Sequence, residues 1–275
     1  MSHPVIDAQA QALGVALLDA WDRCALMPLP SARPGGLSTA QAYAAVTHAC
    51  MLREARGERR RGWKIGFTNR GIWDRYGVHQ PMWAPVWDGT LRLLPGTQAT
   101  LSLAGLCQPR LEPEIVFGFA QAPRAGMTLA ELQACLDWVA HGFEVVHTHF
   151  ADWRFTAADT AADFALHGRL LVGPRVPVAG WATLAADLSA LQVELWGDGD
   201  LRDQGQGAIV LDGPLQALKA LVDAMAETTP HWHIEAGDVV TTGTLTDAWP
   251  LQPGQAWHTR LSDARLAGLT LRTEA

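Results

Sequence analysis

The sequence predicts an α+β fold, in which N-terminal helices lead into a longer part of the chain made mainly of short strands. Residues 5–26 and 39–59 repeat apolar side chains at helical spacing. Residues 111–117 and 142–146 are instead short apolar runs, rich in β-branched side chains and close to glycine or proline, which is typical of strands. At 275 residues the chain is long enough for one large domain or two small ones with a sizeable core.

The N-terminal third contains a clear helix start and an unusual lysine. Ser38 and Gln41 have the spacing of a capping box, in which each side chain satisfies a backbone N–H at the start of a helix. Residues 62–68 are then predicted to be a strand, with Lys64 among aromatic and aliphatic side chains. A buried lysine needs a carboxylate, an anionic ligand or a lowered pKa; a lysine whose stem packs while its ammonium group reaches water is the equal alternative.

Residues 70–89 lack periodicity and are dense in tryptophan, proline and glycine, so we expect a long structured loop there. Loops of this kind often close over substrates, and this one is predicted to be a lid. His79 and Asp88 would then supply acid–base groups at the reacting carbons. Asp88 followed by glycine is also an ordinary turn pair, and a turn is the stronger interpretation of those two residues alone.

Candidate metal ligands lie on the two central strands. Side chains alternate along a strand, so Glu112 and Glu114 point the same way with Cα atoms roughly 6–7 Å apart. Glu144 is a third acid, in the other strand. Half-buried acids on one face repel each other, and a hard divalent cation such as Mg²⁺ or Mn²⁺ relieves that conflict. The alternative is a solvated strand face paired with Arg110 or another basic residue.

A pair of histidines offers a different kind of metal site. His147 and His149 are two residues apart, which puts both imidazoles on one face of a strand, and Cys135 is nearby in the sequence. Zinc is therefore an alternative ion. Oxygen ligands already suffice for a metal, however, and strand histidines are often only hydrogen-bonded, which is the preferred interpretation.

Composition excludes several classes of function. The net charge of −7 and the absence of a basic run interleaved with aromatic residues argue against a nucleic-acid surface. No apolar stretch is long enough to span a bilayer. The four cysteines are scattered, without a Cys-x-x-Cys pair, as in a reduced protein. We therefore expect a cytoplasmic protein that binds neither nucleic acid nor membrane.

The C-terminal half adds candidate substrate contacts. In the segment 237–244, Gly243 lets the backbone approach a ligand, and Thr242 or Thr244 can donate to a carboxylate; a strand ending in a bend is the alternative. Asp163 is a further candidate for substrate binding, with capping of the following segment as its alternative. The remaining elements are expected to be a helix at 128–139, strands at 170–173 and 191–197, and a helix at 214–225.

The order of these motifs resembles the 2-hydroxypenta-2,4-dienoate hydratase and 4-oxalocrotonate decarboxylase family, within the fumarylacetoacetate hydrolase superfamily. The resemblance covers about residues 38–260 and rests on separated segments in the same order: 62–68, 76–81, 112–114, 144–146 with 151–153, and 159–163. It implies a mixed β-sheet roll with peripheral helices, divided into an N-terminal helical region with the active-site strand and lid (1–92) and a metal-binding catalytic core (93–275). It also implies that Glu112, Glu114 and Glu144 hold Mg²⁺ or Mn²⁺, and that Lys64 is the active-site lysine.

Departures from the family pattern gather around the substrate. His147-Thr148-His149 stands where the family usually has Asp-Ser-Arg. Asp163 is followed by Phe164-Ala165-Leu166-His167 in place of asparagine and small residues, and Met82-Trp83-Ala84 replaces Asp-Phe-Gly in the lid. The metal acids are intact, so these changes bear on substrate identity.

The function expected from the resemblance is a divalent-metal-dependent lyase that acts on a short 2-oxo or 2-hydroxydienoic acid. Hydration of a 2-keto-4-pentenoate-type substrate in aromatic meta-cleavage catabolism is the preferred reaction. The alternatives are a 4-oxalocrotonate-type decarboxylase, an acylpyruvate C–C hydrolase, and a non-catalytic metal-binding subunit. A homo-oligomer is expected, or a complex with a related family member.

Overall fold

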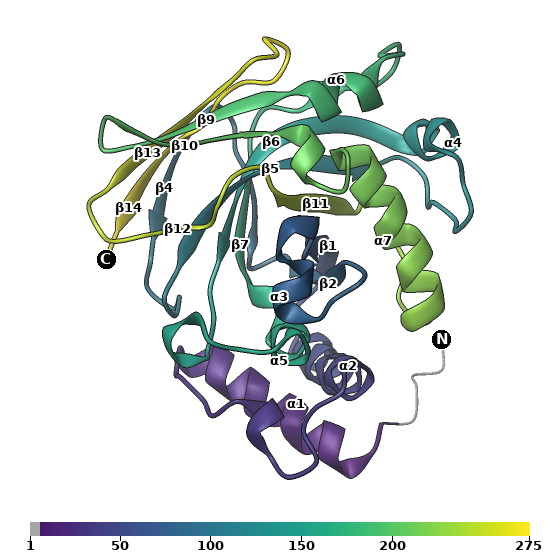
Figure 1. Ribbon diagram of the computed structural model, residues 1–275, viewed down its shortest axis with the longest axis vertical. Coiled ribbons are helices and arrows are strands. Elements are labelled where there is room, and N and C mark those ends of the chain that lie inside the picture. The colour runs from purple at the N-terminus through teal and green to yellow at the C-terminus, as the bar shows by residue number, and fades with distance from the viewer. Residues whose placement is uncertain (1–5) are drawn as a thin grey trace.

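Two β-sheets and a set of peripheral helices make up the described part of the chain, residues 6–275 of a computed structural model (Figure 1). The larger, nine-stranded sheet runs β2-β1-β11-β5-β6-β7-β3, with β12 also pairing with β5 and β8 with β6. Its strands are β1 (Arg60–Gly66), β2 (Met82–Trp87), β3 (Leu91–Leu93), β5 (Arg110–Phe119), β6 (Leu136–Val146), β7 (His167–Val172), β8 (Val176–Pro177), β11 (Val239–Thr244) and β12 (Trp249–Pro250).

The smaller sheet has five strands in the order β10-β9-β13-β14-β4. These are β4 (Gln98–Ser102), β9 (Gln192–Gly197), β10 (Asp200–Gln206), β13 (Ala256–Leu261) and β14 (Thr270–Glu274). Both sheets are mixed, since β1 pairs with β11, β3 with β7 and β14 with β4 in parallel, while the other pairs are antiparallel. The expectation of a mixed, curled sheet is confirmed.

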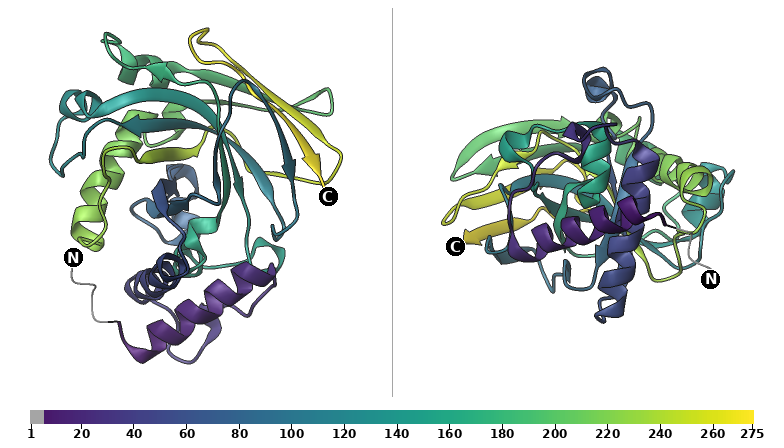
Figure 2. Two further views of the ribbon diagram at one scale, coloured as in Figure 1. Left: turned by 180° about the vertical axis from the view of Figure 1, so that it is seen from behind. Right: turned by 90° about the horizontal axis from the view of Figure 1, so that it is seen from below.

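The first two helices pack together at one end of the molecule, and a later long helix packs on the larger sheet (Figure 2). The α-helices are α1 (Ala8–Arg23), α2 (Thr39–Ala55), α3 (Trp73–Tyr76), α4 (Leu129–Ala134), α5 (Ala157–Ala162), α6 (Leu184–Ala190) and α7 (Pro214–Thr228). Single 3₁₀ turns are η1 (Pro30–Ala32), η2 (Arg70–Ile72), η3 (Ala151–Trp153), η4 (Phe164–Leu166) and η5 (Gly207–Ile209). None of the helices among residues 6–275 is long and apolar enough to cross a membrane.

The N-terminal helices follow the sequence signals closely. Ser38 and Gln41 form the predicted capping box at the start of α2. Helix α1 crosses α2 at the end of the molecule away from the five-stranded sheet (Figure 2), and Gly14 allows the close approach, because a Cβ there would lie 2.6 Å from the carbonyl oxygen of Ala45. The predicted start of α1 at residue 5 lies outside the described residues.

One hydrophobic core joins the N-terminal helices to the larger sheet. Leu17 of α1 and Val46 of α2 belong to the same buried cluster as Ile65 of β1, Phe117 of β5 and Val240 of β11. Strands β1 and β2 also belong to the same sheet as β5 and β6. Residues on both sides of residue 92, the expected boundary between the two regions, therefore pack in one core and pair in one sheet.

The structure corrects two predicted elements. Residues 82–87 of the expected lid form β2, a fully buried strand. Among the described residues β2 pairs only with β1, at the edge of the sheet. An edge strand tolerates Pro85, which has no backbone N–H to donate. Helix α4 ends at Ala134, and residues 136–146 continue as β6 because they pair with β5 along almost its whole length. Tertiary pairing outweighs the local helical signal there.

Replacing Leu17 by alanine is expected to lower the free energy of unfolding by about 2–5 kcal/mol, because this side chain is 1% exposed in the shared core. Val15→Ala, in the same helix but at a 52% exposed position, should change it by less than about 0.5 kcal/mol. Urea unfolding followed by circular dichroism measures both. A small effect for both variants would mean that α1 packs only loosely on the remainder of the chain.

Candidate metal centre

Three glutamates converge where β5 and β6 pair. The antiparallel register puts Glu112 directly opposite Glu144, and Glu114 follows two residues later on the same face of β5. One carboxylate oxygen from each of the three residues lies within 4.8 Å of the others. Glu114 and Glu144 are fully buried, whereas Glu112 is partly exposed. The structure therefore brings together the three acids that the sequence predicted to be ligands.

Neighbouring backbone and side-chain groups orient two of the acids through one oxygen each. Glu114 Oε2 accepts hydrogen bonds from the amide of Gly243 at 2.8 Å and from the hydroxyl of Thr241. Glu144 Oε1 lies 2.8 Å from Nδ1 of His167. The other oxygens, Glu114 Oε1 and Glu144 Oε2, are buried and accept no geometrically defined hydrogen bond from the described residues, and an ion pair with Lys64 at 3.3 Å is the contact of Glu144 Oε2. Oxygens left in this way fit a bound cation, because buried acceptors are otherwise hydrogen-bonded.

Electrostatics also favour a divalent ion at this position. Burial raises the pKa of Glu112, Glu114 and Glu144 above the usual range, and repulsion between the acids raises the pKa of Glu112 and Glu114 further. His167 is kept neutral, since burial lowers its pKa well below the ordinary value. With all three acids ionised and Lys64 protonated, the cluster carries −3 + 1 = −2 charges, which one Mg²⁺ or Mn²⁺ balances.

Lys64 lies beside the acids, on β1. Its Nζ is 3.3 Å from Glu144 Oε2 and donates a 2.9 Å hydrogen bond to the carbonyl oxygen of Ala165. Burial alone would lower the pKa of Lys64, but Glu144, Glu112 and Glu114 together outweigh it and raise the pKa. Lys64 therefore stays protonated, as a fixed positive charge next to the carboxylates.

The carbonyl that receives Lys64 lies in a strained segment. Phe164, Ala165 and Leu166 have φ values of 51°, 48° and 65°, in the left-handed region that non-glycine residues rarely adopt. Backbone strain of this kind is typical of functional sites, where the surrounding structure holds it in place. This is also the segment in which the sequence departs from the family pattern.

A cavity of about 260 Å³ opens beside Lys64 and Glu112. Aromatic and aliphatic side chains of several elements line it: Phe67, Ile72, Tyr76, Trp153 and Phe155. Part of the predicted lid, from η2 and α3, therefore does reach the cavity. The size and the largely apolar wall suit a short acid with an unsaturated carbon chain.

Arg110 is a cavity residue that the sequence analysis assigned only to an alternative. It lies at the start of β5, lines the cavity, and places its guanidinium 4.0 Å from the ring centroid of Trp153. Its position two residues before Glu112 on the same strand face was the available signal. Partial burial lowers the pKa of Arg110, and Glu112 opposes that shift. A guanidinium stays protonated in proteins, so the side chain is a cation available to an anionic ligand.

The Thr-Gly-Thr segment supports the metal site more than it faces a substrate. Gly243 and Thr244 line the cavity, but the amide of Gly243 holds Glu114 and the Thr244 hydroxyl bonds to the Thr246 carbonyl. Thr242 is buried and donates to the carbonyl of Ile115. A side chain at position 243 would clash with Thr68, because its Cβ would lie 2.0 Å from Thr68 Oγ1.

Three other predicted site residues lie elsewhere. Asp163 accepts hydrogen bonds from Thr148 and from both the backbone and the ring of His149, and it does not line the cavity. Asp88 is exposed in the turn after β2, where it accepts from the amides of Arg59 and Gly89. His79 is exposed on a separate surface hollow with Arg70 and Gln80. None of the three lines the cavity beside Lys64 and Glu112, and their expected roles at the substrate stay predictions.

Solved structures of other proteins share the fold of this chain. Among solved structures, 4-oxalocrotonate decarboxylase from Pseudomonas putida G7, complexed with magnesium and adipate, matches with a TM-score of 0.88 and 24% identity, covering 99% of this chain and 100% of that chain. This likeness shows the fold, the mixed β-sheet roll with peripheral helices that the resemblance implied. No family model matches the chain.

Sequence relatives cover most of the chain. It is 33% identical over 255 residues to a 2-hydroxyhexa-2,4-dienoate hydratase from Comamonas testosteroni, covering 91% of this chain and 90% of the relative. It is 34% identical over 222 residues to a 2-keto-4-pentenoate hydratase from Burkholderia vietnamiensis, covering 80% of each. The chain therefore belongs to the 2-keto-4-pentenoate hydratase and 4-oxalocrotonate decarboxylase family.

Mg²⁺ or Mn²⁺ is expected to raise the unfolding temperature, and to raise it more near pH 8 than near pH 6. In the unfolded chain, glutamates lose their protons above about pH 4.3. In the metal-free folded protein, Glu112, Glu114 and Glu144 keep their protons to higher pH, because their pKa values are raised. The metal-free protein thus loses this contribution to stability as pH rises, while the ion competes with fewer protons. Differential scanning fluorimetry at several pH values measures the effect.

Glu114→Gln keeps the shape of the side chain but removes a charge, so it should weaken the metal response and flatten its pH dependence. Glu227→Gln, at an exposed position on α7, is the control and should behave like the unchanged chain. An undiminished response in Glu114→Gln would place the ion elsewhere.

Proposed function

We propose that this protein is a divalent-metal-dependent lyase that hydrates a short 2-hydroxydienoic acid of the 2-keto-4-pentenoate type in aromatic catabolism. The observation that carries the proposal is the convergence of Glu112, Glu114 and Glu144 within 4.8 Å, beside a small cavity that Lys64 also lines. The names of the relatives support the same class of reaction. When bound, Mg²⁺ or Mn²⁺ would supply electrophilic stabilisation of the negative charge that develops on the substrate's 2-oxygen.

Lys64 is proposed to bind an oxygen of the substrate. An ammonium group has three N–H donors, and in the described part of the chain Lys64 contacts Glu144 and Ala165, which leaves one donor for the ligand. Because its pKa is raised, Lys64 acts as a fixed cation and not as the proton donor. A preorganised charge in a site of low polarity stabilises an enolate without reorganising during the reaction.

Water addition also needs a group that moves protons to and from the carbon chain. The described titratable side chains that line the cavity are Lys64, Tyr76, Arg110, Glu112 and Asp247. Glu112 is the acid of this set that belongs to the three-glutamate cluster and is partly exposed, so a water molecule that it orients is the proposed proton carrier. It replaces Asp88 and His79 in that role.

One observation favours the decarboxylase as the second candidate. A dienoic acid with one carboxylate needs one cationic site besides the metal, whereas 4-oxalocrotonate carries a second carboxylate. Arg110 supplies a second cation in the same cavity, stacked on Trp153. A guanidinium held in this way is suited to bind a carboxylate. Acylpyruvate hydrolysis is tested with an acylpyruvate, and a non-catalytic role is tested by the absence of turnover of all three kinds of substrate.

Lys64→Met should fold but lose turnover by about 100-fold or more, because it removes a fixed positive charge from beside the developing anion. Lys219→Met, which removes only a surface ion pair with Asp223, is the control. Steady-state kinetics with 2-hydroxypenta-2,4-dienoate and Mg²⁺ measures the change. Equal kinetics for both variants would assign Lys64 a purely structural role.

Arg110→Met separates the two candidate reactions. If the protein is a hydratase, this variant should keep most of its activity on 2-hydroxypenta-2,4-dienoate, whose chain end is uncharged. A loss of about 10-fold or more confined to 4-oxalocrotonate, mainly through KM, would instead favour the decarboxylase, because one charged hydrogen bond contributes roughly 1.5–3 kcal/mol. NMR identification of the products decides the reaction. No turnover of 2-hydroxypenta-2,4-dienoate, 4-oxalocrotonate or an acylpyruvate would favour the non-catalytic alternative.

A homo-oligomer, or a complex with a related family member, also remains a prediction. The two assemblies differ in subunit composition, so native mass spectrometry of protein purified with and without a co-expressed relative distinguishes them.

A further inference from the structure

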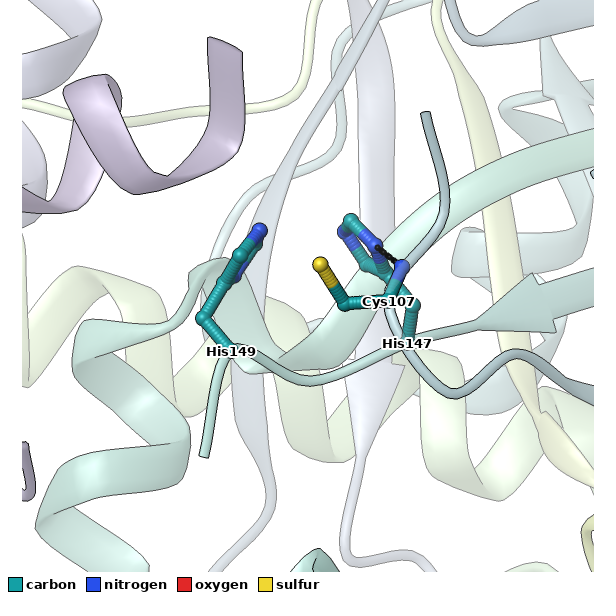
Figure 3. Close-up of side chains that lie close together, drawn as sticks. All are labelled: Cys107, His147 and His149. Carbon is teal, nitrogen blue, oxygen red and sulfur yellow. Dashed lines mark hydrogen bonds between the residues drawn. The ribbon is translucent and has the colours of Figure 1, made fainter. Parts of the chain in front are cut away.

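A second group of potential metal ligands lies apart from the glutamates. Cys107 is in the loop before β5, and His147 and His149 follow the end of β6. One ligand atom from each lies within 4.8 Å of the others, and all three side chains are buried. Figure 3 shows the Cys107 thiol between the two imidazole rings. The sequence analysis had paired these histidines with Cys135, but it is Cys107 that the fold brings to them.

His149 is already prepared to bind a metal ion. Its Nδ1 lies 2.6 Å from Asp163 Oδ1, so Nδ1 carries the proton and Nε2 keeps its lone pair. The backbone amide of His149 and the hydroxyl of Thr148 hold the other oxygen of Asp163 at 2.9 and 3.1 Å. A carboxylate that fixes the far nitrogen of a ligating histidine is a common arrangement around zinc.

The Nε2 atoms of His147 and His149 are buried and have no hydrogen-bond partner among residues 6–275. His147 Nδ1 accepts a long, 3.2 Å hydrogen bond from the amide of Cys107. Ligation through His147 Nε2 moves its proton to Nδ1 and ends that contact. The loss of one long neutral hydrogen bond is small beside the free energy of zinc coordination.

Cys24 lies next to Cys107, outside the group of three ligand atoms within 4.8 Å of one another, and a small movement of its side chain would make it the fourth ligand. It follows α1 in a left-handed conformation, and its Sγ lies 2.9 Å from Cys107 Sγ, too far for a disulfide bond of about 2.05 Å. The Trp21 ring packs at right angles against His147 with centroids 4.8 Å apart, which helps to close the cluster to water. Two thiols and two imidazoles in a closed setting are the ligand set of a structural zinc site.

We propose that Cys24, Cys107, His147 and His149 bind one zinc ion, at a site separate from the three glutamates. Binding breaks two S–H bonds, releases both protons to solvent and forms two zinc–sulfur and two zinc–nitrogen bonds, with no change of oxidation state. Two thiolates neutralise the ion, so the buried centre has no net charge. Softer sulfur and nitrogen donors select zinc, whereas the carboxylates select magnesium or manganese.

Zinc at this position would brace the segment that holds Lys64. The amide of His147 donates to the carbonyl of Leu166, and Asp163 both holds His149 and begins the strained turn that ends in Leu166. Ala165, whose carbonyl accepts from Lys64, lies within that turn. The departures from the family pattern at residues 147–149 and 164–166 are thus in contact with each other, and Ala165 and Leu166 also line the cavity beside Lys64.

Metal analysis of the untagged full-length chain, purified with reductant, tests the proposal. We expect one zinc ion per chain, and Co²⁺ in its place should show thiolate-to-cobalt charge transfer with intense tetrahedral bands. Cys107→Ser and His149→Gln should lose this binding, while Cys135→Ser, at a buried cysteine outside the cluster, should keep it. Asp163→Asn should weaken zinc binding by about 10–100-fold, because Asp163 positions His149 without touching the ion.

Several outcomes would overturn the proposal: no stoichiometric zinc in the reduced protein, unchanged zinc binding in folded Cys107→Ser and His149→Gln variants, or a Cys24–Cys107 disulfide in place of the metal. If either variant fails to fold by circular dichroism, the cobalt spectrum of the unchanged chain decides between a thiolate site and none. Glu114→Gln should retain zinc while losing its response to Mg²⁺, which separates this site from the proposed catalytic one.

Discussion

The burial of three carboxylates beside a single ammonium group is the constraint on which the site depends. Antiparallel pairing of β5 and β6 places Glu112 opposite Glu144, with Glu114 next on the same face. Lys64 compensates one of the three charges. Uncompensated buried charge is strongly destabilising, so the fold requires either bound protons or a divalent cation. This explains why the acids have raised pKa values and why metal binding should stabilise the protein.

Much of the surrounding structure holds these charges in place. Gly243 and His167 each fix one carboxylate, and the strained turn at 164–166 presents a carbonyl to Lys64. The family's usual residues near the third acid are replaced by His147 and His149, which turn towards Cys107 instead of the cavity. The chain therefore has the three acids that the family pattern implies, next to a segment in which His147 and His149 depart from that pattern.

The sequence predicted most of the helices, strands and candidate metal ligands, but not all of the contacts between residues far apart in the chain. Period-two spacing identified Glu112 and Glu114, and the capping box located the start of α2, because both signals are local. The contact between Cys107 and the two histidines was missed, since it joins residues forty positions apart through the fold. The position of Asp88 in the turn after β2 could not be read from the sequence, because a turn pair has the same sequence whether it lies in a lid or at a sheet edge. The strand β2 was not predicted, because Pro85 argues against a strand unless the strand lies at the edge of a sheet.

Anomalous X-ray diffraction from a crystal soaked in Mn²⁺ tests the central claim most directly, because it locates the ion without reference to activity. The account predicts one manganese peak bounded by carboxylate oxygens of Glu112, Glu114 and Glu144, on the side of the cavity that Lys64 lines. A peak at another position, or none at saturating Mn²⁺ near pH 8, would contradict it. The three acids would then be held by shared protons, and the proposed lyase chemistry would have no metal centre.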